Sequence, residues 1–424
     1  MRDELTKRRH WKNSLLKKGR RNRVPEEPHF RIAAVLKNKN ILLGVTGSVA
    51  VYKAIDLTRR LLDEGASVHV IMTDASKRFI TPLSFEIASR NRVYSDTFQD
   101  PMSHITLTSD ADVMVVAPAT ANSIGKYAHG IADDMLSTCL ISFRGTVVIA
   151  PAMNWRMYES PVFRKNLQTL AEMGVIQVGP QKGSLACGED GIGRMSEVQE
   201  IMEGIFSALS KKDLAGKRMV VTAGPTREYM DPVRFISNRS SGKMGYAVAR
   251  AALRRGAEVV LISGPSHLTP PAHAVFVPVE TAEEMRVAVR GALKGSSALI
   301  MAAAVADFSP CERNKRKISK SSALNVTFSK TPDILSEIGS MKKRPFLVGF
   351  AAETGAHIDR ARRKLIGKGA DMVIFNDVTS EGSGFDVDTN EITIIEKRGI
   401  SSFPLMTKDA VADAILDRIV KLVP

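Results

Sequence analysis

Short apolar runs that end in glycine, proline or another small residue recur along this chain, and stretches with helical periodicity separate them. In the first half these runs occupy residues 39–45, 67–73, 113–119 and 146–153. Between the first two runs, one face of a predicted helix carries Val51, Ala54, Ile55, Thr58, Leu61 and Leu62. Strands that are apolar on both faces and alternate with helices predict a parallel sheet with helices on both sides.

The same alternation begins again after residues 211–213. A strand and turn follow at 217–225, then a helix at 244–255, further apolar strands, and a last helix over about 408–422. A chain of 424 residues is also too long for one ordinary core. We therefore predict an α/β protein of two Rossmann-like domains, the second with a mostly parallel sheet. The predicted parts are a basic extension at 1–37, a first domain at 38–210 and a second domain at 211–424.

The positive charge of the chain is concentrated at its start. Residues 1–37 hold 12 Lys and Arg against 4 Asp and Glu, while the whole chain has a net charge of +15. This segment has few apolar residues, so we do not expect it to pack as a domain. It could contact RNA or a membrane surface, but we favour a solvated extension and expect no nucleic-acid partner.

The chain has the features of a cytoplasmic protein. No apolar run approaches the roughly 18–20 residues that a membrane span requires, and the charged N-terminus lacks the apolar core of a signal peptide. The three cysteines, Cys139, Cys187 and Cys311, form no CxxC pair. This pattern argues against a disulfide framework or a zinc site and favours a reducing compartment.

Polar and small residues at the ends of the predicted strands are candidates for ligand binding, because ligands of such sheets lie beyond the carboxyl ends of the strands. The turn Thr46-Gly47-Ser48-Val49 could hold a phosphate, although a tight Gly-Ser turn without a ligand explains it equally well. The dinucleotide motif GxGxxG is absent, so one phosphate and a flat ring fit better than a dinucleotide. Further strand-end candidates are Thr73, Ala117, Pro118, Ala119, Thr120 and Ala152.

Cys187 lies in the glycine-rich stretch GSLACGEDGIGRM, about thirty residues after the segment PAMNWRM at 151–157. Thiols otherwise prefer the core, so a cysteine on a glycine-flanked loop indicates chemistry. Together the two segments suggest a lid over an oxidisable or decarboxylatable substrate. Cys139 fits a core position, and Cys311 has no chemical partner in its neighbourhood.

Residues 38–424 resemble the bifunctional phosphopantothenoylcysteine decarboxylase/phosphopantothenate–cysteine ligases of coenzyme A biosynthesis. The segments that carry the resemblance occur in order. They are HITLTSDADVMVVAPATAN, PAMNWRM and ACGEDGIGRM in the first half, and VTAGPTREYMDPVRFISNRSSGKMG, AAAVADF, KI at 317–318, TPDIL, VGFAAET and IFND in the second. The extension at 1–37 falls outside the resemblance.

For the first half, the resemblance implies a flavodoxin-like domain that decarboxylates 4′-phosphopantothenoylcysteine with FMN. The cofactor would oxidise the thiol-bearing carbon transiently, CO2 would leave, and the electrons would return. His104 would act as acid or base, Asn154 would hold the departing carboxylate, Met157 would line the pocket, and Cys187 would donate a proton. Without the family, a lone histidine is usually structural, and Asn154 could simply cap a following helix.

For the second half, the resemblance implies that CTP with Mg2+ activates 4′-phosphopantothenate as an acyl-cytidylate, which the amine of L-cysteine attacks. Asn238 would handle that intermediate, and Gly224 with Ser240–Gly245 would form anion-binding turns. The implied CTP contacts are Met301, Ala302, Ala303, Asp307, Lys317, Pro332, Asp333, Ile334, Phe350, Lys364 and Lys368. Read alone, Lys364 and Lys368 fit a solvated helix face and Lys317 an exposed loop; GxxxxGK[ST] is absent. The metal ligands stay undefined.

The resemblance also implies a homo-oligomer, with trimeric contacts in the decarboxylase half and dimeric contacts in the ligase half. Three other interpretations compete with it. A nicotinamide-dependent oxidoreductase is disfavoured by the missing dinucleotide motif. A non-catalytic regulatory flavoprotein is disfavoured because His104, Asn154 and Cys187 are all present. An RNA-binding protein would depend on the extension alone.

Overall fold

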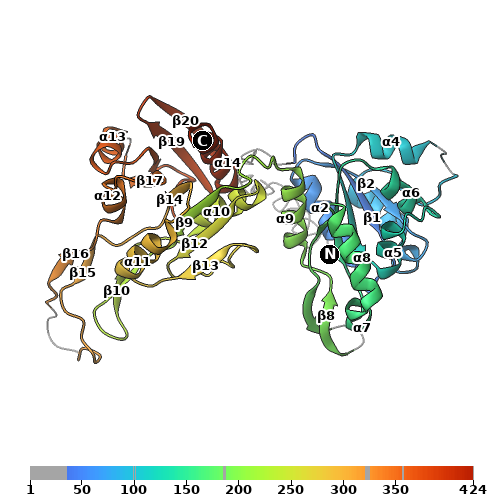
Figure 1. The fold of residues 1–424 in the computed structure, drawn as a ribbon, viewed down its shortest axis with the longest axis horizontal. Coiled ribbons are helices and arrows are strands. Elements are labelled where there is room, and N and C mark those ends of the chain that lie inside the picture. The colour runs from blue at the N-terminus through green and yellow to red at the C-terminus, as the bar shows by residue number, and fades with distance from the viewer. Residues whose placement is uncertain are drawn as a thin grey trace, which may run out of the picture. The chain divides into compact units, whose positions relative to one another are not determined.

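The computed structural model describes residues 36–98, 100, 102–184, 188–319, 325–355 and 358–423. Two separate parallel sheets, one in each half of the chain, confirm the predicted α/β class with Rossmann-like topology. Figure 1 shows each sheet with its own helices around it. In the described part of the chain, no helix has the length and apolar character needed to cross a bilayer.

The first sheet has the strand order β3-β2-β1-β4-β5-β6, and all its neighbouring pairs are parallel. In full this is the 3-2-1-4-5-6 order of Rossmann sheets, with two-residue strands, β3 and β6, at its two edges. The strands other than β3 follow the 2-1-3-4-5 order of flavodoxin-like sheets. The strands are β1 (Asn40–Val45), β2 (Ser67–Met72), β3 (Val93–Tyr94), β4 (Val113–Ala119), β5 (Thr146–Pro151) and β6 (Ile176–Gln177).

Helices cover both faces of this sheet, as its apolar strands require. One core joins the sheet to α2, α3 and α9, and a second core joins it to α4, α5, α6 and α8. The helical segments of this half are η1 (Val49–Val51), α2 (Tyr52–Asp63), η2 (Ser76–Arg78), α3 (Pro82–Ser89), α4 (Ser103–Asp110), α5 (Ala121–Ala128), α6 (Met135–Ser142), α7 (Trp155–Glu159), α8 (Pro161–Glu172) and α9 (Val198–Leu209).

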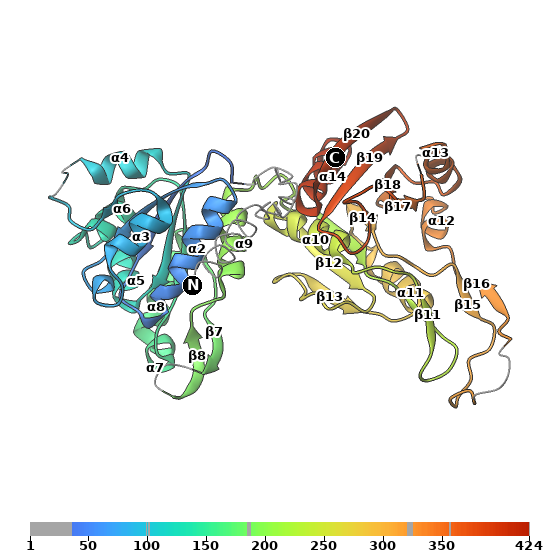
Figure 2. The ribbon, with the colours of Figure 1, turned by 180° about the vertical axis from the view of Figure 1, so that it is seen from behind.

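A hairpin of β7 (Gln181–Ser184) and β8 (Asp190–Arg194) stands apart from the first sheet. Seen from behind in Figure 2, it lies beside α7. Met153 N–H donates to Gly193 O over 3.0 Å, and a Cβ on Gly193 would lie 2.1 Å from Met153 O. The backbones of the two segments that sequence analysis grouped into one lid therefore touch at this point.

The second sheet has the order β13-β12-β9-β14-β17-β18-β19-β20. Its first six strands are parallel and follow the 3-2-1-4-5-6 order of Rossmann sheets, while β19 and β20 add an antiparallel edge. The strands are β9 (Arg218–Ala223), β12 (Glu258–Ser263), β13 (Val275–Pro278), β14 (Ala298–Met301), β17 (Phe346–Glu353), β18 (Met372–Asp377), β19 (Thr389–Glu396) and β20 (Gly399–Thr407).

Helices again form two layers in this half. One core joins α10 and α14 to the sheet, and the other joins α11, α12 and α13 to it. These helices are α10 (Lys243–Arg254), α11 (Ala282–Ala292), α12 (Ile334–Gly339), α13 (Ile358–Gly367) and α14 (Lys408–Leu422). Two small ribbons, β10 (Arg227–Tyr229) with β11 (Phe235–Ser237) and β15 (Phe308–Pro310) with β16 (Phe328–Lys330), extend from the second sheet (Figure 1).

Candidate functional sites

Each sheet carries a cavity where its strand order reverses. In the first sheet, β1 lies between β2 and β4, and in the second, β9 lies between β12 and β14. The chain adds strands on one side of β1 or β9 and then returns to add β4 or β14 on the other side. The crevice at this switch point is where open α/β sheets bind ligands. A cavity of about 1230 Å³ lies there in the first half, and one of about 690 Å³ lies there in the second half.

A threonine at the end of β1 fixes the backbone around the first cavity. Thr46 Oγ1 donates to Pro118 O over 2.7 Å and accepts from Thr120 N–H over 3.1 Å. The buried hydroxyl therefore ties the turn after β1 to the end of β4. The adjacent Gly47 is needed for packing, because a Cβ there would lie 2.5 Å from Ala75 Cβ.

The first cavity brings together most of the residues predicted to bind a cofactor. Gly47, Ser48, Val49, Thr73, Thr120 and Ala152 all line it. The hydroxyls and the backbone of the turn after β1 form a polar end, and Met72, Leu136, Met153 and Met157 add apolar surface. Such a combination of anion-binding turn and apolar wall fits a flat ring that carries a phosphate.

Three predicted cofactor residues lie elsewhere. Ala117, Pro118 and Ala119 belong to β4, which is buried along its whole length, and they are not among the cavity-lining residues. The central position of β4, between β1 and β5, explains this burial. Their contribution to the site is made through the backbone, as in the contact of Thr46 with Pro118 O.

Asn154 and Met157 both line the first cavity. Asn154 is also the N-cap of α7, and its Oδ1 accepts from Arg156 N–H over 2.9 Å. Asn154 therefore both caps a helix, as its sequence position suggested, and lines the cavity. Because Oδ1 accepts the capping hydrogen bond, Nδ2 is the atom that would donate to a carboxylate.

His104 is not among the lining residues of the first cavity. It lies in the first turn of α4, half-buried, and its Nδ1 is buried without a hydrogen-bond partner in the structure. The neighbouring Met102 and Ile105 expose 63% and 42% of their surface. Cys187 lies outside the described residues.

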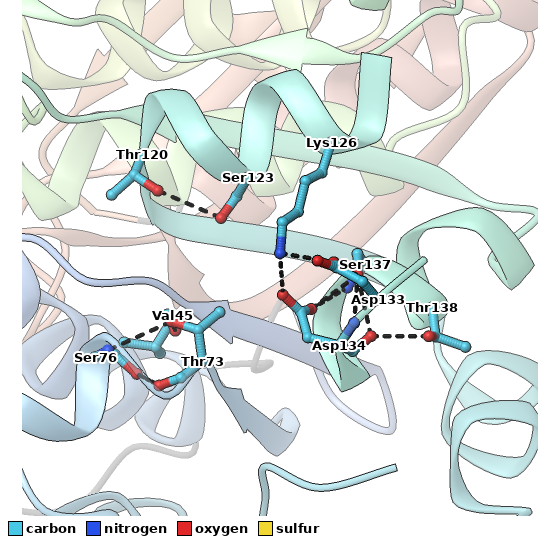
Figure 3. Close-up of polar contacts among 10 residues, drawn as sticks. All are labelled: Val45, Thr73, Ser76, Thr120, Ser123, Lys126, Asp133, Asp134, Ser137 and Thr138. Carbon is cyan, nitrogen blue, oxygen red and sulfur yellow. Dashed lines mark hydrogen bonds and ion pairs between the residues drawn. The ribbon is translucent and has the colours of Figure 1, made fainter. Parts of the chain in front are cut away.

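A charged cluster that sequence analysis missed lines the first cavity. Lys126 Nζ on α5 lies 2.7 Å from Asp133 Oδ1 and 2.8 Å from Asp134 Oδ2 (Figure 3). Asp134 also caps α6 by accepting from Ser137 N–H over 2.8 Å. Burial raises the pKa of Asp134, but Lys126 and the Ser137 donors outweigh it and hold that pKa below its usual value. Cys139, placed in the core from its sequence, is buried on α6, and burial raises its pKa to about 12.

The second cavity is built on a similar frame. Ala303 N–H donates to Thr222 Oγ1 over 3.2 Å, which ties the end of β9 to the segment after β14. Gly242, at φ +81°, begins α10, and a Cβ on Gly245 would lie 2.6 Å from Ala223 Cβ. The start of α10 therefore packs directly against the end of β9, and Gly242, Lys243 and Met244 line the cavity.

Ten of the eleven residues predicted to bind CTP line the second cavity. They are Met301, Ala302, Ala303, Asp307, Pro332, Asp333, Ile334, Phe350, Lys364 and Lys368. Lys317 is not among the lining residues; it is exposed, and the neighbouring Ile318 N–H donates to Asp231 Oδ2 over 3.1 Å. Asn238 does line the cavity, and its Nδ2 donates to Val305 O over 2.9 Å.

Lys364 on α13 and Lys368, which directly follows that helix, line this cavity rather than forming a solvated face. Lys364 Nζ donates to Phe350 O over 2.6 Å, and burial lowers the pKa of Lys364. Lys368 is ion-paired with Asp333, the N-cap of α12. Burial raises the pKa of Asp333, yet Lys368 and Ser336 N–H bring it below its usual value.

Several cavity residues of the second half were not predicted to contact the nucleotide. They include Lys330, Asn376, Gly384, Phe385, Asn390 and Lys408. Lys408 follows β20 directly and starts α14, so nothing in its local sequence pointed to the cavity. Among the described residues, no group of three or more His, Cys, Asp and Glu side chains could hold a metal ion.

Family models match both halves of the chain. A family model described as Flavoprotein matches residues 31–210. A model described as DNA/pantothenate metabolism flavoprotein C-terminal domain matches residues 214–423. The Coenzyme A biosynthesis bifunctional protein CoaBC of Bacillus subtilis is 47% identical over 398 residues, which are 92% of this chain and 98% of the relative.

The protein of the same name from Escherichia coli K12 is 42% identical over 396 residues, which are 91% of this chain and 97% of the relative. A solved structure, the C-terminal domain of Coenzyme A biosynthesis bifunctional protein CoaBC, is 41% identical. It covers 50% of this chain and 98% of its own chain, with a TM-score of 0.44.

Proposed function

The chain belongs to the family of bifunctional coenzyme A biosynthesis proteins, and from this premise we propose how its two halves share the work. The second half ligates 4′-phosphopantothenate to L-cysteine, and the first half decarboxylates the product to 4′-phosphopantetheine. The observation that supports this assignment of the two reactions is the difference in charge between the two cavities. Four cations and four carboxylates line the first, whereas six cations and two carboxylates line the second.

The second cavity has the electrostatics that a nucleoside triphosphate needs. Its six cations are Arg239, Lys243, Lys330, Lys364, Lys368 and Lys408. Neutralising phosphates in a crevice lined by fixed positive charge is the main source of binding energy for such ligands. We propose CTP as that ligand, with Mg2+ bound through its phosphates, and the exposed loop carrying Lys317 as the segment that closes over it.

Asn238 is proposed to act at the acyl-cytidylate. Its side chain lies at the lip of the second cavity and already donates toward Val305 O. A neutral donor at this place can stabilise negative charge that develops on the acyl oxygen as the cysteine amine attacks. CMP then leaves, and the new amide is the substrate of the first half.

In the first half, the polar turn after β1 would hold the phosphate of FMN, and the apolar walls would hold its ring. FMN would supply reversible two-electron oxidation of the thiol-bearing carbon of the substrate. Asn154 Nδ2 would orient the carboxylate that departs as CO2, and Met157 would exclude water beside it. Cys187 would donate the proton that completes the product.

His104 is proposed to serve the cavity of a neighbouring copy. It does not line its own cavity, and exposed apolar side chains surround it on α4, among them Met102 and Ile105. Leu83 and Ile87 on α3 expose 60% and 69% of their surface and would be covered in the same assembly. A trimer through the first half, with dimeric contacts through the second, agrees with this placement.

The decisive experiment follows both half-reactions in one sample. The purified chain, given CTP, Mg2+, L-cysteine and 4′-phosphopantothenate, should release pyrophosphate and CO2 and form 4′-phosphopantetheine. Supplying ATP in place of CTP tests the nucleotide preference. A chain that binds no FMN, or that releases no pyrophosphate with any nucleotide, would refute the proposal for the corresponding half.

A further inference from the structure

The connection between β18 and β19 crosses the edge of the second cavity. We call residues 383–388 the strap. Gly384 and Phe385 of the strap line the cavity. At the base of the strap, Ser383 Oγ donates to Asn376 Oδ1 over 2.7 Å, and Gly384 N–H donates to Asn390 Oδ1 over 3.2 Å. The first end of the strap is therefore bound to both β18, through Asn376, and β19, through Asn390.

Lys408 is hydrogen-bonded to the backbone of the strap. Its side chain is buried, and its Nζ donates to Gly384 O over 3.0 Å, Phe385 O over 3.4 Å and Val387 O over 2.5 Å. An ammonium group has three hydrogens, and three carbonyls of one short segment accept them. A buried charge is costly unless hydrogen bonds compensate for it. The three carbonyls compensate the charge of Lys408, and the lysine in turn holds this segment in place.

The other side of the strap holds the turn at the start of α10. Ser241 Oγ donates to Phe385 O over 2.6 Å. Lys243 Nζ lies 2.6 Å from Asp388 Oδ1, and Arg239 Nε lies 2.6 Å from Asp386 Oδ2. The turn at 238–245 contains Asn238 and the glycines that bring α10 against β9. A continuous set of contacts thus runs from Lys408 through the strap to the anion-binding turn.

We propose that Lys408 is a positioning residue of the ligase reaction, which acts through the strap to hold the turn at 238–245 in place for the triphosphate. The inference rests on the proposed ligase function. It assigns to Lys408 the positioning of the turn and leaves direct contact with the nucleotide to Lys364 and Lys368. A displacement of the turn by a fraction of an ångström would misplace several backbone donors together.

The test uses the full chain with Lys408→Met, which removes the charge and keeps the length of the side chain. Lys421→Met is the matched control, because Lys421 is an exposed lysine on the same helix. We expect Lys408→Met to lower kcat/KM for pyrophosphate release by about 10- to 100-fold, chiefly through a higher KM for CTP. Release of CO2 from supplied 4′-phosphopantothenoylcysteine, which reports on the other half, should not change.

A double-mutant cycle with Asp386→Asn separates positioning from direct contact. If Lys408 acts through the strap, the two substitutions lose the same interaction, and their effects on KM for CTP fall short of additive. Additive effects, or an unchanged KM in Lys408→Met, would overturn the inference. Should Lys408→Met fail to fold, Asp386→Asn alone decides, because an unchanged KM there overturns it equally. A wild-type chain that releases no pyrophosphate would instead refute the ligase function on which the inference rests.

Discussion

The two halves of the chain place their cavities at the same point of similar sheets, and they differ in what lines them. In both, a threonine at the end of the first strand, Thr46 after β1 or Thr222 in β9, accepts a hydrogen bond from the segment that follows β4 or β14. The first cavity is balanced in charge and partly apolar, while the second carries an excess of cations. The sheet thus determines where a ligand binds, and the side chains determine its chemical class.

The largest expected effect is the loss of one half-reaction while the other continues. Cys187→Ser should lower the steady-state rate of CO2 release by about 10²- to 10⁴-fold, because each turnover stops where Cys187 would donate the proton that completes the product. Pyrophosphate release should continue at the wild-type rate. Both products are measured in the same reaction. Loss of both activities in folded protein would break the division of labour.

Asn238→Asp should have the reverse effect. Replacing a neutral donor by a carboxylate beside Val305 O removes the hydrogen bond and adds repulsion toward an acyl oxygen. Pyrophosphate-coupled amide formation should fall by about 10²- to 10³-fold, the range for loss of one such donor. Decarboxylation of supplied 4′-phosphopantothenoylcysteine serves as the control and should be unaffected.

Mixing two inactive variants tests whether the first half completes its site between copies. His104→Asn and Cys187→Ser should each be inactive in CO2 release when assembled alone. Unfolded and refolded together, they should regain a measurable fraction of activity, because some sites in a mixed oligomer then contain both wild-type groups. Absence of any recovery in mixed oligomers would place His104 and Cys187 in the cavity of the same copy.

Salt should distinguish the cavities by a smaller effect. Raising the ionic strength from 0.1 M to 1 M shortens the screening length from about 10 Å to about 3 Å. The KM for CTP should rise several-fold, because its cavity carries an excess of positive charge. The KM for 4′-phosphopantothenoylcysteine should rise less. Equal salt dependence would show that cavity charge does not decide ligand class.

The smallest expected effect concerns stability of the first half. Asp134→Ala removes the cap of α6 and should cost about 1–2 kcal/mol. Both tryptophans, Trp11 and Trp155, precede residue 211, so urea unfolding followed by their emission reports on this half. Asp133→Ala removes the half-exposed pairing with Lys126 and a long hydrogen bond of 3.4 Å from Ser137 Oγ, and it should cost less than about 1 kcal/mol.

The pH dependence of Asp134 follows from its lowered pKa. Its stabilisation is fully present above the ordinary value of 3.8 and is lost as the pH falls through the lower, folded-state value. Acid unfolding of the first half should therefore be less steep in Asp134→Ala than in the wild type. An unchanged acid transition would show that this carboxylate is not a major acid-sensitive group.

Strongly periodic elements could be predicted from the sequence. The run at 113–119 is β4, and the last helix spans Lys408–Leu422 as expected. The hairpin of β7 and β8 and the ribbons of β10–β11 and β15–β16 were not predicted. Their strands have three to five residues, rich in glycine or exposed, so they lack the alternation that indicates a strand.

Site residues could likewise be predicted only where a local sequence pattern marked them. Residues that follow a strand directly, such as Ser48 and Thr120, could be expected at a cavity because parallel strands end at one edge. Lys126 and Lys408 could not, because each lies on a helix and reaches its cavity only through the packing of that helix. Lys364 and Lys368 were singled out only through the family resemblance, since their spacing also fits a solvated face.

The sequence by itself determined two α/β halves and the strand ends at which their cavities lie, because apolar periodicity and turn residues are local properties. The tertiary structure alone decided that Lys364, Lys368 and Lys408 line a cavity and that His104 does not line the cavity of its own half. Those placements depend on contacts between residues far apart in the chain, which no local pattern records.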